Sequence, residues 1–265
     1  MSVNPFYFHI KDVTHRFYLY PCLTHIIGLV MSKKSFTLLI VGTICLISFA
    51  VWTILVAFAD VQPFGVNDTK IGLSTLNLWI FHHVGTNMVL FVVTDWLGLV
   101  PISICLIFGV VGFIELIRRK SLFKVDRDII LLGIYYAVVI FLYLLFEMVV
   151  INYRPILIDG HMESSYPSST TLLVLSVMPT LSFEADKRFK NKWIKRIINL
   201  SAVSFSLFMA IGRLVSGVHW ISDIIGSVIL SGGLFTMYLF SLSCIEDKER
   251  NNNGVQRQVI RIKKK

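Results

Sequence analysis

Charged residues are scarce in this 265-residue chain. Only 15% of the residues are charged, and 55% are hydrophobic, whereas a soluble domain carries roughly 25% charged residues. This number of charged residues cannot cover the surface of a water-soluble domain of this length. Much of the exterior must therefore face lipid. The composition therefore excludes a single soluble globule and indicates an integral membrane protein.

Cysteine is also rare, and its positions carry no recognisable pattern. The four cysteines lie inside or beside apolar stretches, without the paired spacing of a zinc site or a disulfide framework. We interpret them as packing residues. They are Cys22, Cys45, Cys105 and Cys244.

The formal net charge of +9 raises the question of a nucleic-acid partner. Lys and Arg occur in short clusters between apolar runs, which is how membrane proteins use them. A basic patch for nucleic acid is therefore not indicated, and we expect membrane lipids as the surroundings.

Long runs without any charge predict membrane spans. A spanning helix needs roughly 20 mostly apolar residues. Four uncharged runs meet this requirement: those between Lys34 and Asp60, Asp95 and Glu115, Asp128 and Glu147, and Asp223 and Glu246. Two shorter stretches, 171–183 and 197–218, count as spans because polar motif residues occupy their ends. The sequence predicts an all-α polytopic membrane helix bundle with six transmembrane helices.

The distribution of basic residues predicts the orientation. Short cytoplasmic loops carry an excess of Lys and Arg. With both termini inside, the cytoplasmic segments hold 22 of the 25 basic residues. Only Lys70, Arg154 and Arg213 then lie outside. We expect a multi-pass protein of the cell membrane with both termini cytoplasmic and its functional site facing outward.

Three regions follow from this plan. Residues 1–34 are expected to form an N-terminal cytoplasmic or interfacial extension, unless the first 30 residues precede the native start. Residues 35–245 form the membrane domain, and residues 246–265 form a basic cytoplasmic tail that is expected to be disordered. A helix over about residues 74–92 mixes apolar and polar positions and is expected to lie in the outer interface as a lid or collar. Its adjacent His82 and His83 are interpreted as solvated side chains, not metal ligands.

Unusual polar residues gather at the predicted outer ends of spans three to six. Arg154-Pro155 follows span three, residues 166–171 open span four, and Arg213, His219 and Asp223 connect spans five and six. Ionisable groups at membrane depth are costly and mark functional sites. These ends are therefore the predicted site.

Each residue type in this set suits phosphate chemistry. Ser168 and Ser169 after Pro167 begin a helix, and a helix N-terminus binds anions. Arg154 and Arg213 can each hold two phosphate oxygens in a planar fork. His219 and Asp223 are four residues apart, so on one helical turn the carboxylate can fix the imidazole and leave its other nitrogen free to attack. The pattern predicts phosphoryl transfer without a metal or cofactor.

The motif resembles the type 2 phosphatidic acid phosphatase superfamily of membrane lipid phosphatases, which is related to vanadium haloperoxidases. The likeness covers roughly residues 90–240 and includes the six-span plan. It implies that His219 is the nucleophile that forms a phosphohistidine and that Asp223 orients it. It also implies that Arg154 and Arg213 hold the phosphate. At the predicted helix start, Pro167 and Ser168 match the family pattern, and Ser168, Ser169 and Thr170 are the expected phosphate-binding residues.

Four positions depart from the family pattern: Glu147 replaces its lysine, Ser169 its glycine, Thr170 its first histidine and Gly212 its serine. The missing histidine normally protonates the leaving group, and loss of a general acid costs about 10²- to 10⁴-fold in rate. A departing phosphate, whose last pKa is about 6, can leave unaided, whereas an alkoxide cannot. We therefore expect a lipid pyrophosphate substrate, with a polyprenyl pyrophosphate as the best candidate.

Several alternatives stay open at this point. The chain could be a lipid phosphotransferase of the same fold, or a binder or transporter of lipid phosphates without activity. Glu147 could hold one of the arginines in place or stay protonated. His161, with Asp159 and Glu163 in the same loop, could supply the proton that Thr170 cannot. The sequence does not predict the oligomeric state.

Overall fold

A computed structural model describes residues 31–64, 66–121 and 125–263. The first 30 residues of the expected N-terminal extension lie outside this part. The chain divides into two compact units. One comprises residues 41–238, and the described parts of the other are residues 31–40 and 239–263. Each unit is described by itself below.

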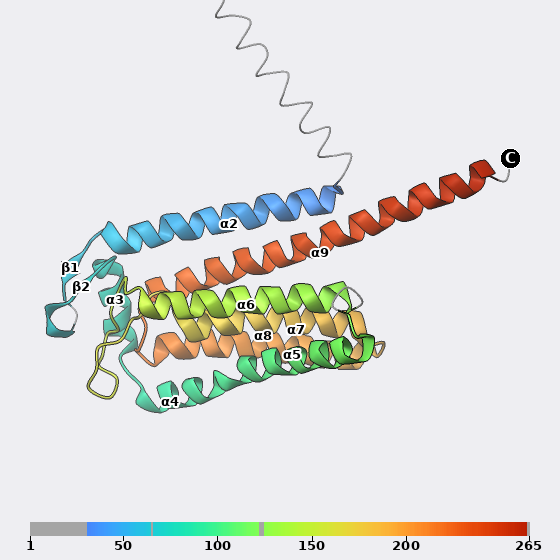
Figure 1. The fold of residues 1–265 in the computed structure, drawn as a ribbon. Helices are drawn as coiled ribbons and strands as arrows, with labels where there is room; N and C mark the ends of the chain where they lie inside the picture. The colour runs from blue at the N-terminus through green and yellow to red at the C-terminus, as the bar shows by residue number, and fades with distance from the viewer. Residues whose placement is uncertain (1–30, 65, 122–124, 264–265) are drawn as a thin grey trace, which may run out of the picture. The chain divides into compact units, whose positions relative to one another are not determined.

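The structure is almost entirely helical (Figure 1). A short antiparallel hairpin follows the helix Lys33–Phe58 and pairs Gln62 with Ile71. The elements in chain order are α2 (Lys33–Phe58), β1 (Gln62–Pro63), the 3-10 helix η2 (Val66–Asp68), β2 (Lys70–Ile71), α3 (Ser74–Val84), α4 (Met88–Leu97), α5 (Leu99–Arg119), α6 (Arg127–Met148), α7 (Ser169–Arg188), α8 (Lys192–Val215) and α9 (Ile221–Lys263).

Five helical segments within the described residues are long and apolar enough to cross a membrane: Lys33–Phe58, Met88–Arg119, Arg127–Met148, Lys192–Val215 and Ile221–Asn252. The predicted all-α membrane helix bundle is therefore confirmed. The fourth predicted span corresponds to α7, which is not among the five. The count of six spans stays a prediction.

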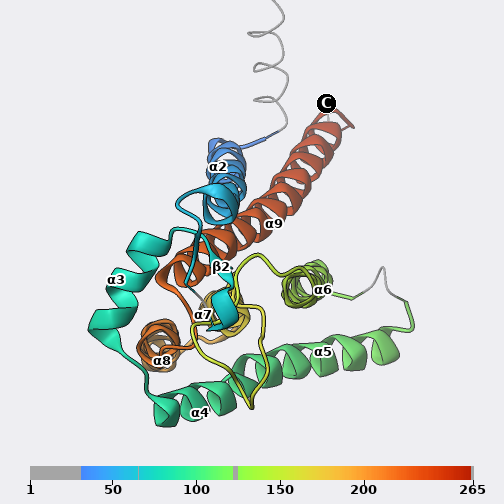
Figure 2. The ribbon, with the colours of Figure 1, turned by 90° about the vertical axis from the view of Figure 1, so that its left-hand side faces the viewer.

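The helix α7 is the buried helix of the unit formed by residues 41–238. It packs against α5, α6 and α8, and Figure 2 shows it between α6 and α8. Val174 and Met178 of α7 form a buried cluster with Met209 of α8. The hydroxyl groups of Tyr136 and Thr180 hydrogen-bond at 2.7 Å. Because its polar groups meet protein partners rather than lipid, α7 can be less hydrophobic than its neighbours.

The predicted interfacial helix over residues 74–92 is wrong in its extent. The chain breaks at Gly85, and residues 88–92 belong to α4, which leads through Gly98 into α5. The side chain of Asn87 accepts a hydrogen bond from the Leu90 amide at 3.0 Å and so begins a new helix. The remaining part, α3, carries the exposed His82 and His83.

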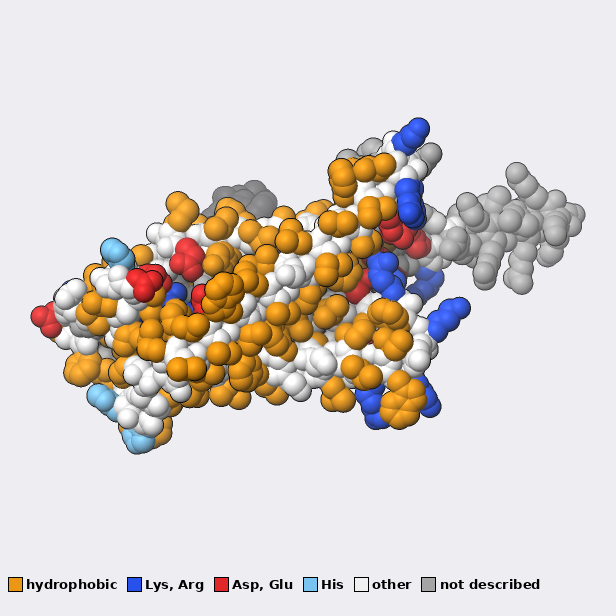
Figure 3. Space-filling view, turned by 90° about the horizontal axis from the view of Figure 1, so that it is seen from below, with side chains coloured by type: hydrophobic (Ala, Val, Ile, Leu, Met, Phe, Trp, Pro, Cys, Tyr) orange, Lys and Arg blue, Asp and Glu red, His pale blue; other side chains and the backbone are white. Residues whose placement is uncertain are grey.

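The surface of residues 41–238 is divided by side-chain type. Figure 3 shows Lys and Arg side chains gathered at one end and hydrophobic side chains along the length of the helices. The exposed basic residues of this end come from the end of α5 and the α7–α8 junction, among them Arg118, Arg119, Lys187 and Lys192. A wide apolar belt with a basic end is typical of a multi-pass membrane protein.

The second unit contains the start of α2 and the end of α9. The carboxylate of Asp247 accepts hydrogen bonds from the Ser32 amide at 2.8 Å and the Ser35 hydroxyl at 2.6 Å. The α9 helix continues to Lys263, so the predicted disorder after Ile245 is wrong. Asp247 and Arg250 pair at 3.8 Å on this helix, which is one local contact that favours it.

Candidate active site

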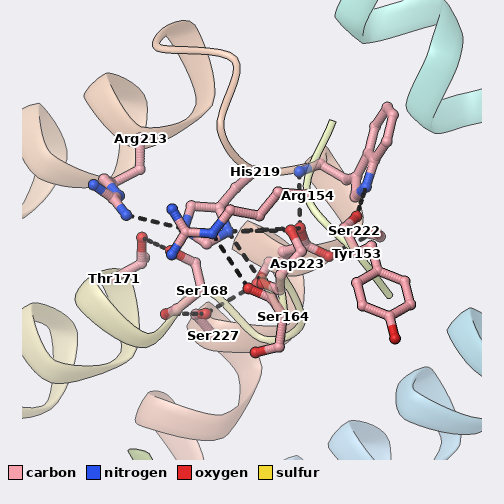
Figure 4. A network of polar contacts seen from close by, with 12 residues as sticks. Tyr153, Arg154, Ser164, Ser168, Thr171, Arg213, His219, Ser222, Asp223 and Ser227 are labelled. Atoms are coloured by element: carbon pink, nitrogen blue, oxygen red, sulfur yellow. Dashed lines mark hydrogen bonds and ion pairs between the residues drawn. The ribbon is translucent and has the colours of Figure 1, made fainter. Parts of the chain in front are cut away.

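Three segments of the unit 41–238 supply the candidate site. The first is the loop between α6 and α7, where isolated bridges pair Tyr153 with Ser164 and Ile158 with His161. The second is the N-terminal turn of α7, and the third is the connection between α8 and α9. Figure 4 shows their side chains converging on His219.

The connection between α8 and α9 depends on a glycine. Gly217 has a φ of 72°, and a Cβ atom there would lie 2.5 Å from the carbonyl oxygen of Gly85. Only glycine satisfies both the backbone angle and the close approach. The resulting turn brings His219 back toward Arg213 on the last turn of α8.

His219 is buried, and its hydrogen bonds define its tautomer. Its Nδ1 atom lies 3.0 Å from the carbonyl oxygen of Ser165. Since a carbonyl oxygen only accepts, Nδ1 carries the proton. The lone pair is therefore on Nε2, which accepts a hydrogen bond from Arg213 at 3.2 Å. A neutral imidazole in this tautomer has its nucleophilic nitrogen beside a guanidinium group.

The position of Asp223 differs from the predicted one. His219 precedes α9, which begins at Ile221, so the two residues do not share a helical turn. The Asp223 carboxylate lies 3.7 Å from Nδ1 of His219, beyond hydrogen-bond distance. It accepts hydrogen bonds from the Trp220 amide at 2.8 Å and from the Ser165 hydroxyl. Ser165 therefore contacts both Asp223 and Nδ1 of His219.

Ser165 is a site residue that sequence reasoning missed. It is fully buried, and it contacts His219 with its carbonyl group and Asp223 with its hydroxyl group. Its only signal in the sequence is a serine two residues before Pro167 in a polar loop, which does not distinguish it from Ser164.

Burial lowers the pKa of His219 well below its ordinary value of 6.5, and the positive charges of Arg213 and Arg154 lower it further. Burial disfavours the charged imidazolium, and like charges do the same. The imidazole is therefore neutral at neutral pH. This is the protonation state that a histidine nucleophile requires.

The two arginines define the predicted phosphate clamp, Arg154 and Arg213. Arg213 is 1% exposed and Arg154 is 8% exposed. The Nε atom of Arg213 is buried and has no hydrogen-bond partner among the residues that the structure describes. A buried unpartnered donor costs free energy unless an acceptor reaches it, so Arg213 is suited to bind an oxyanion.

Each arginine of the clamp also contacts a carboxylate. Arg154 pairs with Glu163 at 3.1 Å, and Arg213 lies 3.5 Å from Asp95 of α4. The side chains of Glu163 and Asp95 are 41% and 62% exposed. Sequence reasoning placed Glu163 near the site but missed Asp95, which stands in an apolar run without any motif.

The helix start predicted at Ser168 is present. Ser168 is the N-cap of α7, but its side chain makes no capping hydrogen bond. Its hydroxyl instead pairs with Thr171 at 2.9 Å, and its carbonyl oxygen accepts from Ser227 at 2.9 Å. The first-turn amides, including those of Ser169 and Thr170, are therefore not capped by Ser168 and can bind an anion.

Glu147 and His161, which the sequence also indicated, lie outside the contacts of the site. Glu147 is exposed near the end of α6, and His161 is exposed in a tight turn with Ile158. In the part of the chain that the structure describes, neither forms an ion pair or hydrogen bond with the clamp.

The fold and the site together define a multi-pass membrane protein with a buried histidine between two arginines. The PAP2 superfamily model matches residues 102–243, which is more than half of the chain. The chain belongs to this superfamily, the type 2 phosphatidic acid phosphatases that the motif resembles.

A solved structure titled as the first transmembrane PAP2 type phosphatidylglycerolphosphate phosphatase from Bacillus subtilis is 19% identical. The match has a TM-score of 0.40 and covers 62% of this chain and 90% of the other. No curated protein matches the chain significantly.

Proposed function

We propose that this protein is a membrane lipid phosphatase that hydrolyses a polyprenyl pyrophosphate through a phosphohistidine on His219. One observation carries the proposal: the Nε2 atom of a buried neutral imidazole lies 3.2 Å from the guanidinium of Arg213, whose Nε has no partner within the described part of the chain. A phosphate held by that guanidinium is brought next to the nucleophile.

The first step forms the phosphoenzyme. The Nε2 lone pair of His219 attacks the terminal phosphorus atom while Arg154 and Arg213 hold its non-bridging oxygens. The bond to the bridging oxygen breaks, and its electron pair leaves with the lipid phosphate. The ring becomes positively charged, and the carbonyl of Ser165 accepts from its Nδ1 proton. The Asp223 carboxylate, 3.7 Å away, stabilises this charge.

The second step regenerates the enzyme. Water attacks the phosphorus atom, the P–N bond breaks, and its electron pair returns to Nε2 of His219. One proton of the water is released to solvent, and inorganic phosphate leaves. The chemistry requires only positioning and charge stabilisation by the protein.

An apolar groove supports a lipid substrate. A cavity of about 750 Å³ lies along α5 and α6 and also contacts Leu173 of α7, which is within the usual size of ligand pockets. Its lining runs from Val125, next to the basic end, to Tyr143 in the last two turns of α6. A hydrocarbon tail in this groove would place its phosphate end near the clamp.

The choice of a pyrophosphate rests on residue 170. Thr170 is half-buried at the start of α7 and cannot protonate a leaving group at neutral pH. A lipid phosphate leaves without a proton, whereas a lipid alkoxide does not. The basic-residue distribution favours an outward-facing site, so we place the substrate in the outer leaflet.

The test is phosphate release by the full-length protein purified in detergent with EDTA present. Polyprenyl pyrophosphate, polyprenyl monophosphate and phosphatidate are compared for the wild type, His219→Ala and the control His83→Ala, which changes an exposed histidine of α3. We expect a preference for pyrophosphate that His219→Ala abolishes and His83→Ala retains. A preference for phosphatidate contradicts the substrate assignment, and activity that survives in His219→Ala contradicts the mechanism.

A further inference from the structure

Tyr143 of α6 lies where the apolar groove meets the phosphate clamp. Its side chain lines the groove together with Ile140 and Leu144 of the same helix. The phenol also lies beside the side chain of Ser169 and within electrostatic range of Arg154. The guanidinium of Arg213 is within electrostatic range of the same phenol. Tyr143 therefore lies next to both the apolar groove, where a lipid tail would bind, and the arginine clamp, where a phosphate would bind.

The junction between tail and phosphate has a defined chemistry. In a lipid phosphate or pyrophosphate, the P–O bond that breaks contains a bridging oxygen. This oxygen lies between the transferred phosphorus atom and the part of the molecule that carries the lipid tail. When the transferred phosphorus lies at the clamp and the tail lies in the groove, this bridging oxygen is at the junction. A hydrogen-bond donor at the junction can stabilise the negative charge that develops on the bridging oxygen.

Tyr143 is suited to be this donor. A phenol keeps its proton at neutral pH and can both donate and accept a hydrogen bond. It is half-buried and comes from a helix, which holds it more rigidly than a loop would. The neighbouring carboxylates Glu147 and Asp95, which interact electrostatically with the phenol, cannot donate when they are ionised.

We propose that the Tyr143 phenol is a catalytic residue that donates a hydrogen bond to the bridging oxygen of the substrate. This inference rests on the proposed function and supplies a leaving-group contact that Thr170 lacks. When the P–O bond breaks, the oxygen keeps the electron pair and departs as an oxyanion hydrogen-bonded to Tyr143. It takes its proton, where it needs one, from solvent, and Tyr143 remains a neutral phenol.

The test measures sensitivity to the leaving group. Phenyl phosphate has a strongly basic leaving group, and 4-nitrophenyl phosphate has a weakly basic one. Tyr143→Phe removes only the hydroxyl. The matched control is Tyr153→Phe, because the carbonyl group of Tyr153, and not its phenol, contacts Trp220, and its phenol points away from the clamp (Figure 4).

We expect Tyr143→Phe to lower kcat for phenyl phosphate about 10²-fold, as on loss of a hydrogen-bond donor to the transition state, and to lower kcat for 4-nitrophenyl phosphate at least tenfold less. Tyr153→Phe should behave as the wild type. An equal loss on both substrates, or no loss, overturns this inference while the phosphatase assignment stands. A wild type without phosphatase activity overturns the proposed function and this inference together.

Discussion

The Nε2 atom of His219 accepts a hydrogen bond from Arg213 at 3.2 Å. The predicted nucleophile and one half of the phosphate clamp therefore touch directly. The other terminal nitrogen of the same guanidinium, Nη1, lies 3.5 Å from the carboxylate of Asp95. We therefore expect a phosphate that binds to Arg213 to lie next to the attacking nitrogen.

This relationship makes the shape of the guanidinium group important. Arg213→Lys keeps the positive charge but removes the planar fork and its two parallel donors. We expect kcat/KM for polyprenyl pyrophosphate to fall about 10²- to 10³-fold, as on loss of a transition-state donor. The control is Arg196→Lys, an exposed residue of the basic end. A fall of less than about threefold in Arg213→Lys would show that charge alone suffices there.

The pKa of His219 gives a prediction about protonation. Burial and the charges of Arg213 and Arg154 lower this pKa well below 6.5, so the active neutral ring is lost only when the pH falls through that lower value. An ordinary imidazole is half-protonated at pH 6.5. We expect His219 to be neutral and protonated on Nδ1 at pH 6.5, as measured by ¹⁵N-histidine NMR, with its signal assigned from His219→Asn. A titration midpoint at or above 6.5 would contradict the burial argument.

The sequence predicts the helical class and most of the site because both leave strong local signals. Uncharged runs predict four of the helices, and Arg213, His219 and Asp223 occur at a specific spacing. The break at Gly85 was missed because apolar residues continue on both sides of it. Contacts between segments leave no such signal. The carbonyl of Ser165 reaches His219 across 54 positions, and no periodicity or composition indicates such a backbone contact.

Ser165 provides a test of how Asp223 acts. Ser165→Ala removes the hydroxyl that contacts Asp223 and lies 3.3 Å from Nδ1 of His219, but keeps the carbonyl that accepts from the same nitrogen. Hydrogen bonds to charged groups contribute about 1.5–3 kcal/mol, so we expect kcat to fall about 10- to 100-fold with KM nearly unchanged. Ser165→Thr keeps a hydroxyl and should restore most of the activity. A rise in KM with constant kcat would mean that Ser165 binds substrate instead.

Gly217 provides a test of the turn before His219. Gly217→Ala introduces a Cβ at a φ of 72° and within 2.5 Å of the Gly85 carbonyl oxygen. We expect a loss of about 1–3 kcal/mol in the free energy of unfolding, seen as a lower Tm in detergent. The control is Gly232→Ala on α9, where nothing lies within 4 Å of the added atom and a helical alanine stabilises by up to about 1 kcal/mol. Equal Tm values for the two variants would show that the turn adapts.

Thr170 provides the sharpest test of the substrate assignment. Thr170→His introduces an imidazole at the position where the family carries its leaving-group acid. The added acid should help a lipid alkoxide leave but give little to a departing lipid phosphate. General acids contribute about 10²- to 10⁴-fold, so we expect kcat/KM for polyprenyl monophosphate to rise at least tenfold relative to polyprenyl pyrophosphate. Thr170→Asn, which adds a polar group without an acid, is the control. If both variants change the two substrates equally, residue 170 does not set the substrate preference, and the choice of a pyrophosphate loses its physical basis.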